Sequence, residues 1–256
     1  MTPVLAFDIE TIPDIAGIRR LHDLPADLPD REVAEVAFQR RRTQTGSDFL
    51  PPQLQRVVVI SCVMRGDDGV RVFSLDGPEP EMIQRFYDGI EKYIPQIVSW
   101  NGGGFDLPVL NYRALIHGVS APMFWETGDE NRDFRYNNYV SRYHARHTDL
   151  MDVLAMYQPR NNAPLDEVAQ LAGLPGKIGV GGAKVWETYL AGEIGKIRDY
   201  CEADTANTYL LFLRYQLLRG VFSKDLFEKE SQILRAYLKG LDKPHWHEFL
   251  KLWNEA

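Results

Sequence analysis

Short apolar runs separated by polar turn residues dominate the first hundred residues. Four of these runs have the length and the content of β-branched or aromatic residues that predict buried strands: 4–8, 57–64, 70–75 and 97–100. The sequence Gly-Asp-Asp-Gly at 66–69 separates the second run from the third and indicates a hairpin. Apolar residues then recur every four positions from Met82 to Ile94, which predicts a helix before the last strand. This order of elements predicts a mixed sheet flanked by helices, in the α/β class.

Helical periodicity replaces the strand pattern in the second half of the chain. Within the early strands, 13–55 reads as a charged insert, in which Asp30 is expected to cap a helix that runs through Arg42. We predict one domain over 1–220 that carries this insert, followed by a helical C-terminal extension over 221–256. The sequence does not indicate what the insert or the extension does. The predicted helices of the second half are 165–174, 184–191, 194–218 and 225–254.

Two carboxylates, Asp8 and Glu10, follow the first apolar run. Residues two apart on a strand point to the same face of a sheet, so these side chains project together. Two carboxylates at the end of a core strand are costly to desolvate, and no Arg or Lys is adjacent to them in sequence. Acidic groups placed in this way usually have a divalent metal ion between them.

Two later segments supply further groups of the same chemistry. Asp106 follows the strand at 97–100 and a Gly-rich stretch, and Pro108 suits the start of a helix. Open α/β sheets commonly bind ligands at such strand-to-helix junctions. Tyr200 and Asp204 are four residues apart in a helical segment, which places a phenol and a carboxylate on one helix face. Taken singly, each signal is also typical of a solvated or salt-bridged surface residue.

The order of these motifs is more specific than any one of them. Phe-Asp-Ile-Glu-Thr at 7–11, Asn-Gly-Gly-Gly-Phe-Asp at 101–106 and Tyr-Cys-Glu-Ala-Asp at 200–204 resemble the three motifs of the DEDD superfamily of 3′-to-5′ exonucleases, which has an RNase H-like fold. The tyrosine resembles that of the DEDDy subgroup. The first two motifs are most similar to the proofreading exonuclease domain of family B DNA polymerases. The resemblance runs from about residue 4 to about residue 213.

The resemblance implies a metal-dependent exonuclease that uses two divalent ions, Mg²⁺ or Mn²⁺, and releases nucleoside 5′-monophosphates from single-stranded 3′ ends, with DNA as the favoured substrate. By this similarity Asp8 would bridge both ions, and Glu10 and Asp204 would complete the site that activates water. Asp106 would serve the other ion. Tyr200 would orient the attacking water, because a phenol with an ordinary pKa of about 10 is a poor base at neutral pH. Carboxylate oxygens are the ligands that both ions prefer.

Residues beside these motifs are candidate substrate contacts. A flat ring such as Phe105 can stack on a terminal base, although a role as a core anchor fits its position equally well. The segment 132–147 contains four Arg and three Tyr and is interpreted as a nucleic-acid contact, with a solvated loop as the alternative. Asp149 is expected to cap a helix, with support of the substrate loop as the alternative. The four candidate contacts are Ile9, Thr11, Asn101 and Phe105.

Length and charge limit these expectations. At 256 residues the chain is too short to include a polymerase. Its formal net charge of −7 argues against broad, non-specific binding of duplexes, which requires many phosphate-neutralising contacts, but it is compatible with a small site for one strand end. The expected partner is therefore a single-stranded 3′ end. The resemblance leaves room for a DNA replication or repair partner, and the sequence does not determine the oligomeric state.

Cys62 and Cys201 are the only cysteines, so a structural disulfide is not expected and a reducing compartment is the simpler assumption. The sequence shows neither a secretion signal nor a long apolar run of membrane-spanning length. We therefore expect a cytoplasmic protein with no membrane partner.

The Gly-rich segment 176–184 superficially resembles a phosphate-binding loop. It fails the Gly-x-x-x-x-Gly-Lys-Ser/Thr pattern because Ala183 separates Gly182 from Lys184, and it follows a predicted helix instead of a strand. We interpret it as a flexible connection.

Three alternative functions differ in what they require. A phosphatase of the haloacid dehalogenase type would need Asp-x-Asp after the first strand, where this chain has Glu10 at the second position. A non-catalytic nucleic-acid-binding module with the same fold would be expected to have lost a metal ligand, and none is lost here. An exonuclease acting on RNA is not distinguished from one acting on DNA, because the contact with the 2′-hydroxyl depends on the geometry of the pocket.

Overall fold

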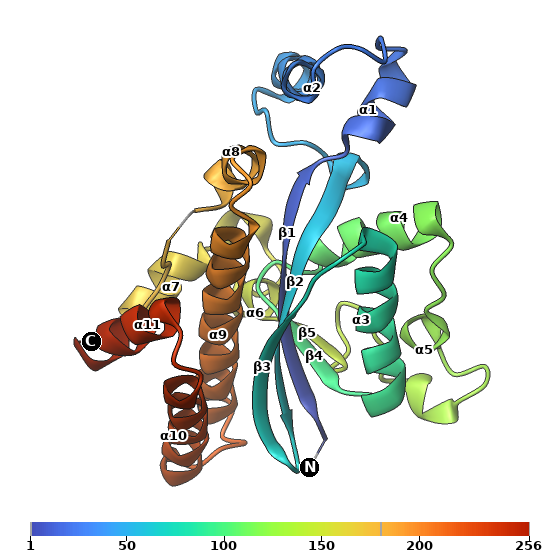
Figure 1. The fold of residues 1–256 in the computed structure, drawn as a ribbon. Helices are drawn as coiled ribbons and strands as arrows, with labels where there is room; N and C mark the ends of the chain where they lie inside the picture. The colour runs from blue at the N-terminus through green and yellow to red at the C-terminus, as the bar shows by residue number, and fades with distance from the viewer. Residues whose placement is uncertain (1, 180, 256) are drawn as a thin grey trace.

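The computed structural model describes residues 2–179 and 181–255, and a five-stranded mixed sheet lies between two layers of helices (Figure 1). The strand order is β3-β2-β1-β4-β5. Strands β1, β2 and β3 pair antiparallel, whereas β4 pairs parallel with both β1 and β5. The predicted mixed sheet and the hairpin at 66–69 are confirmed. The strands are β1 (Val4–Pro13), β2 (Gln55–Gly66), β3 (Gly69–Leu75), β4 (Gln96–Ser99) and β5 (His147–Asp149).

Strand β1 is longer than its apolar run indicates. It pairs with β2 as far as Pro13, which lies opposite Gln55, and the register shifts at a bulge between Glu10 and Thr11. The prediction that Asp8 and Glu10 lie at the end of the strand is therefore wrong. They lie inside it, because the apolar residues of β2 extend the ladder past the polar positions of β1.

Helices cover both faces of the sheet (Figure 1). On one face, α3, α4 and α5 bury aromatic and aliphatic side chains against β1, β2 and β4. On the other, α9 crosses the sheet, with the other helices of the second half packed around it. The first group is α3 (Glu79–Tyr93), α4 (Asp106–His117) and α5 (Pro122–Trp125). The second group is α6 (Leu150–Leu154), α7 (Leu165–Leu171), α8 (Val185–Leu190), α9 (Ile194–Leu218), α10 (Lys224–Gly240) and α11 (Pro244–Glu255).

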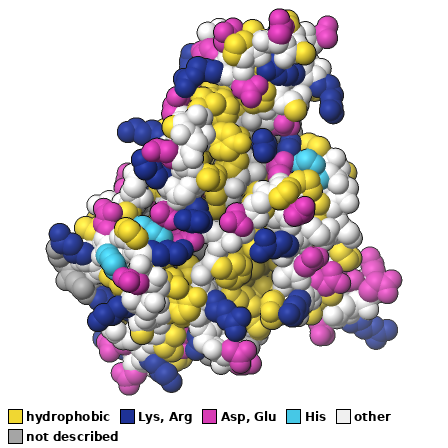
Figure 2. Space-filling view, viewed as in Figure 1, with side chains coloured by type: hydrophobic (Ala, Val, Ile, Leu, Met, Phe, Trp, Pro, Cys, Tyr) yellow, Lys and Arg dark blue, Asp and Glu magenta, His cyan; other side chains and the backbone are white. Residues whose placement is uncertain are grey.

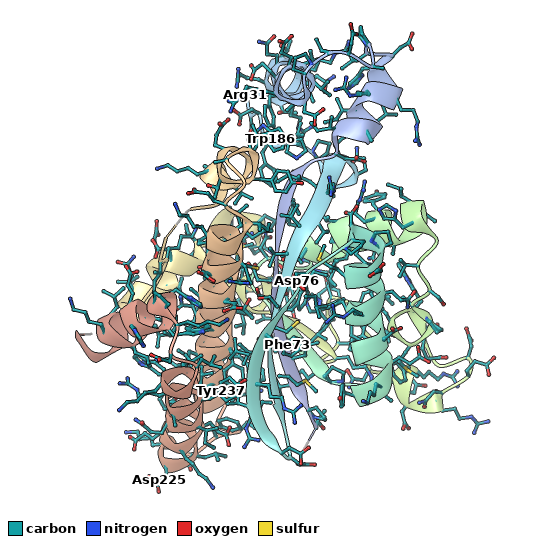
Figure 3. The ribbon with its side chains drawn as sticks, viewed as in Figure 1. Arg31, Phe73, Asp76, Trp186, Asp225 and Tyr237 are labelled. Carbon is teal, nitrogen blue, oxygen red and sulfur yellow. The ribbon has the colours of Figure 1, made fainter. Side chains whose placement is uncertain are left out.

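The insert forms two helices, α1 (Ile15–His22) and α2 (Asp30–Thr45), beyond one end of the sheet (Figure 1). The two helices enclose a small core of their own. The insert ends in a 3-10 turn, η1 (Pro52–Leu54), that leads into β2. Arg31 of α2 donates two hydrogen bonds to the Glu187 carboxylate of α8, with N···O distances of 3.0 and 2.8 Å. Figure 3 shows Arg31 and Trp186 on the two sides of this junction. The insert therefore contacts the helical layer that carries α9.

One local prediction is wrong, and one strand was not predicted. Asp30 does not cap α2, because Pro29 occupies the N-cap position and Asp30 is the first helical residue, where its carboxylate pairs with Arg19 at 2.9 Å. Strand β5 has no counterpart among the predicted elements, because its sequence His-Thr-Asp contains no apolar run. It forms through parallel pairing with β4, a contact between residues about fifty positions apart.

The C-terminal helices share the core of α9. Trp246 and Phe249 of α11 are fully buried, and His245 Nε2 lies 2.9 Å from the buried Glu202 carboxylate of α9. The division of the chain at residue 220 stays a prediction. Cys62 and Cys201 are buried free thiols, in agreement with the expected absence of a disulfide. Across the part of the chain that the structure describes, no helix is long and apolar enough to cross a membrane.

Candidate active site

The three acidic motifs meet beside the middle of β1. Asp8 and Glu10 project from β1, Asp106 is the first residue of α4, and Tyr200 and Asp204 lie one turn apart on α9. Glu10, Asp106 and Asp204 are buried, and Asp8 is half-buried. The structure therefore brings together all five side chains that the motifs single out, from three elements that are distant in sequence.

Hydrogen bonds fix these elements to one another. The backbone N–H of Ile9 donates to Asp106 Oδ1 at 3.2 Å, which ties the start of α4 to β1 between the two acidic residues of that strand. The Cys201 thiol donates to Asp8 Oδ2 at 3.4 Å, which ties α9 to the same strand. One ligand atom from each of Asp8, Glu10 and Cys201 lies within 4.8 Å of the others. The acidic side chains are thus held close together by the fold.

The four carboxyl groups are unusually basic. Burial raises the pKa of Asp106 to about 7 and the pKa of Asp204 to about 6. Burial raises the pKa of Asp8 and of Glu10 as well, and the charges of neighbouring carboxylates raise both further. This cluster therefore lacks sufficient compensating positive charge within the described protein, the condition that a bound cation relieves.

One carboxylate oxygen of the cluster is not satisfied by the hydrogen bonds of the described residues. Asp204 Oδ1 is buried and has no hydrogen-bond partner among the described residues. A buried polar atom without a partner is destabilising, so such atoms commonly face a ligand, ion or water. The potential metal-ligand atoms in the cluster are carboxylate oxygens, which suit Mg²⁺ or Mn²⁺. The residues present therefore fit a divalent metal centre.

Tyr200 is 4 % exposed and is held in its neutral form. Burial raises the pKa of its phenol far above the usual range, and the charges of Asp204, Glu10 and Asp8 raise it further. Its hydroxyl can therefore donate a hydrogen bond throughout the neutral pH range, but cannot ionise to act as a base.

Lys177 is a site residue that the sequence motifs do not reveal. Its positive charge lowers the pKa of Asp8, Glu10 and Asp204, and its Nζ lies 5.8 Å from the centre of the Tyr200 ring. Its backbone N–H donates to Asp166 Oδ1 at 2.7 Å. The Gly-rich segment therefore brings a charged residue to the site as well as connecting two helices. The one sequence feature that could have pointed to Lys177 is a lysine among glycines.

The predicted substrate contacts adjoin the acidic motifs: Ile9 and Thr11 flank Glu10 in β1, and Asn101 and Phe105 lie in the segment that leads to Asp106. The side chain of Asp149 accepts the backbone N–H groups of Asn101 and Gly103, both at 2.9 Å, and also caps α6. Asp149 therefore both caps the helix and supports the loop at 101–103, while contact of this loop with a substrate stays a prediction. Asn101 adopts the left-handed conformation with φ of 65°, and Phe105 is half-buried at the N-cap position of α4. Their contact with a substrate stays a prediction.

Residues 47–253 match the family described as "Predicted 3'-5' exonuclease related to the exonuclease domain of PolB". The chain belongs to this family. The matched range includes Asp106, Tyr200 and Asp204, whereas Asp8 and Glu10 precede it. The RNase H-like architecture and the kinship with family B polymerases that the motifs predict are thus confirmed.

Two similar proteins are larger than this member of the exonuclease family. A DNA polymerase of Archaeoglobus fulgidus is 28% identical over 189 residues, which are 72% of this chain and 23% of the polymerase. The solved structure of the family B DNA polymerase from Pyrobaculum calidifontis matches 85% of this chain and 25% of its own, with 21% identity and a TM-score of 0.52. The chain thus spans about a quarter of the length of either polymerase. The structural likeness shows the fold.

Two arginines of the segment 132–147 have interaction partners within the fold. Arg142 pairs with Asp152 at 2.6 Å, and the Arg146 guanidinium lies 3.8 Å from the centre of the Phe134 ring. These two arginines therefore have partners within the fold, and contact of 132–147 with nucleic acid stays a prediction.

The raised carboxyl pKa values predict how pH affects the stability of the metal-free protein. Asp106 has a folded-state pKa of about 7, against about 3.9 in an unfolded chain, so the folded state binds the extra proton between these values. The free energy of unfolding should therefore fall as pH rises from about 5.5 to about 8, on the order of 2 kcal/mol for Asp106 alone. Denaturant titrations in EDTA at both pH values measure this. The slope should flatten in Asp106→Asn, and a stability that rises with pH would contradict the argument.

Proposed function

We propose that the chain is a metal-dependent 3′-to-5′ exonuclease of the DEDDy type that removes nucleoside 5′-monophosphates from single-stranded 3′ ends, with DNA as the favoured substrate. The observation that carries this proposal is the convergence of four carboxylates, one helical turn from a neutral Tyr200. Among them, Asp204 Oδ1 is buried and has no hydrogen-bond partner among the described residues. A carboxylate cluster that holds metal ions suits chemistry at a phosphodiester. The phosphodiester is anionic, and the bound ions would supply the positive charge that it requires.

The resemblance of the three motifs assigns a role to each carboxylate. Asp8, between the other carboxylates, would hold both of two ions, with Glu10 and Asp204 completing the site beside Tyr200. Asp106, at the start of α4, would hold the second. When bound, such ions lower the pKa of water and stabilise negative charge on the leaving oxygen. Lys177, whose charge lowers the pKa of Asp8, Glu10 and Asp204, would contribute positive charge for a substrate phosphate.

Replacing Tyr200 by phenylalanine tests the role of its hydroxyl. The neutral phenol would orient the attacking water by donating a hydrogen bond, so Tyr200→Phe should lower kcat about 10- to 100-fold and change KM little. Steady-state kinetics on a labelled single strand measure both constants. Tyr189→Phe, on the neighbouring helix α8, is the matched control. Full turnover by Tyr200→Phe would remove the positioning role while leaving the metal site untouched.

Surface charge favours a strand end over a long duplex. Lys and Arg side chains are interspersed with Asp and Glu side chains over the face shown in Figure 2, and the formal net charge is −7. Such a surface does not provide the many phosphate contacts of non-specific duplex binding. At a strand end, Lys177 and the bound metal ions would supply the positive charge for one or two phosphates.

A degradation assay tests the proposed function. Purified protein is incubated with a 5′-labelled single strand and Mg²⁺ or Mn²⁺, and we expect a ladder that shortens from the 3′ end and disappears in EDTA. Matched DNA and RNA strands assign the substrate, since an RNA-directed exonuclease would prefer the latter. Binding of strands without metal-dependent degradation of either would instead support a non-catalytic nucleic-acid-binding module.

A further inference from the structure

The insert places an exposed aromatic ring beside the candidate active site. Phe49 is 59% exposed, and its ring centroid lies 5.2 Å from that of Phe105, with an angle of 50° between the ring planes. Phe105 directly precedes Asp106 at the start of α4. Phe49, which is distant in sequence, thus extends the aromatic surface of Phe105, the residue next to the candidate metal ligand Asp106.

Hydrogen bonds connect the position of Phe49 to β1. The Gln55 side chain donates from Nε2 to the carbonyl of Leu50 at 2.9 Å and accepts from the Thr11 hydroxyl at 3.0 Å. Thr11 follows Glu10 directly, and both Gln55 and Leu50 are buried. The backbone beside Phe49 is therefore anchored to the strand that carries two of the acidic residues, while the ring itself remains accessible.

Single exposed aromatic side chains are common, so exposure alone indicates nothing. The informative features are the ring contact with Phe105 and the buried chain of hydrogen bonds that leads back to Thr11. Together they hold an accessible, two-ring surface at the edge of the carboxylate cluster. Aromatic rings bind unpaired bases by stacking, and they do so for every base because each has a π-face.

We propose that Phe49 is a substrate-positioning residue, and that Phe49 and Phe105 together form a platform on which a base at the 3′ end of the strand stacks. This inference rests on the proposed exonuclease function and assigns a role to the insert. A base must leave its partner strand before it can stack here, so the platform would favour unpaired ends. It would also hold the terminal phosphodiester against the carboxylates without reading the base sequence.

Kinetics of Phe49→Ala test the proposal in the full-length protein. We expect KM for a single-stranded substrate to rise about tenfold, with kcat changed less than about twofold, and Phe49→Tyr to restore the wild-type KM. Phe73→Ala is the matched control, because Phe73 is also exposed but lies on the edge strand β3, separated from β1 by β2 (Figure 3). A KM for Phe49→Ala equal to that of Phe73→Ala would overturn the inference.

A substrate that lacks the terminal base separates stacking from a structural role. Wild-type protein should bind a 3′-terminal abasic strand about tenfold more weakly than the intact strand, and Phe49→Ala should show little difference between the two. If Phe49 only supported Phe105, Phe49→Ala would weaken both strands equally, which would contradict the proposal. If wild-type protein neither degraded nor bound any strand, the exonuclease function itself would fail, and this inference with it.

Discussion

Replacing Asp204 by asparagine, or Asp8 by alanine, is expected to lower the rate of strand hydrolysis at least about 10³-fold, since metal ions contribute several kcal/mol to the stabilisation of such reactions. The charge of Asp204 raises the pKa of Asp8, and burial raises the pKa of Asp204 to about 6. Removing either carboxylate deletes a proposed metal ligand. The same change also removes a charge that the metal-free folded state accommodates poorly.

The structure therefore predicts two opposite effects of one substitution. Activity should be lost, whereas the Tm measured in EDTA at pH 8 should rise by roughly 5 °C, because the raised pKa of Asp204 marks it as destabilising when ionised in the folded protein. Addition of Mg²⁺ or Mn²⁺ should stabilise wild-type protein more than Asp204→Asn.

An exposed aspartate supplies the control for both measurements. Asp76 lies just after the edge strand β3 (Figure 3), and Asp76→Asn should change neither activity nor the response to metal. Rapid metal-dependent hydrolysis by Asp204→Asn would contradict the assignment of this residue. A lower metal-free Tm for that variant would show that the Asp204 carboxylate is satisfied within the protein, although its buried Oδ1 has no hydrogen-bond partner among the described residues.

Motif order predicts the acidic cluster because each element that carries it has a strong local pattern. Asp8 follows an apolar run within β1, Asp106 is the first residue of α4, and Asp204 lies within the long helix α9. The arrangement of these elements follows from the fold that their order predicts. Even so, the local pattern placed the end of β1 too early, because the length of that strand depends on its pairing with β2.

Residues positioned only by long-range contacts could not be predicted in the same way. Lys177 approaches the carboxylates from a Gly-rich segment without helical or strand periodicity, and its location depends on the packing of that segment beside α9. Phe49 reaches Phe105 across more than fifty residues of sequence. Strand β5 forms by pairing with β4 alone. In each case the local sequence pattern contains the residue but does not indicate which distant residue fixes its position.

Replacing Arg113 by methionine is expected to lower the free energy of unfolding by about 3–5 kcal/mol, the usual consequence of leaving a buried charge without its partner. Arg113 of α4 is 3% exposed, and its Nε donates to Glu79 Oε1 of α3 at 2.8 Å. Its Nη1 lies 2.5 Å from the carboxylate of Asp14, which caps α1 at the start of the insert. Glu79 also accepts the backbone N–H of Val57 in β2 at 2.7 Å.

This ion-pair network joins the helix that begins with Asp106 to the sheet and to the insert. Its loss should therefore disturb the position of Asp106 as well as lower the free energy of unfolding. Denaturant titration of Arg113→Met measures the free energy, and the corresponding fall in Tm should be roughly 10 °C. Arg85→Met is the control, because Arg85 lies on the exposed side of α3. A loss below about 1 kcal/mol would mean that Glu79 and Asp14 find other partners. In that case α4 would be positioned chiefly by its apolar contacts with α3, and the insert would be joined to the sheet by its own core and the Thr11–Gln55–Leu50 hydrogen bonds.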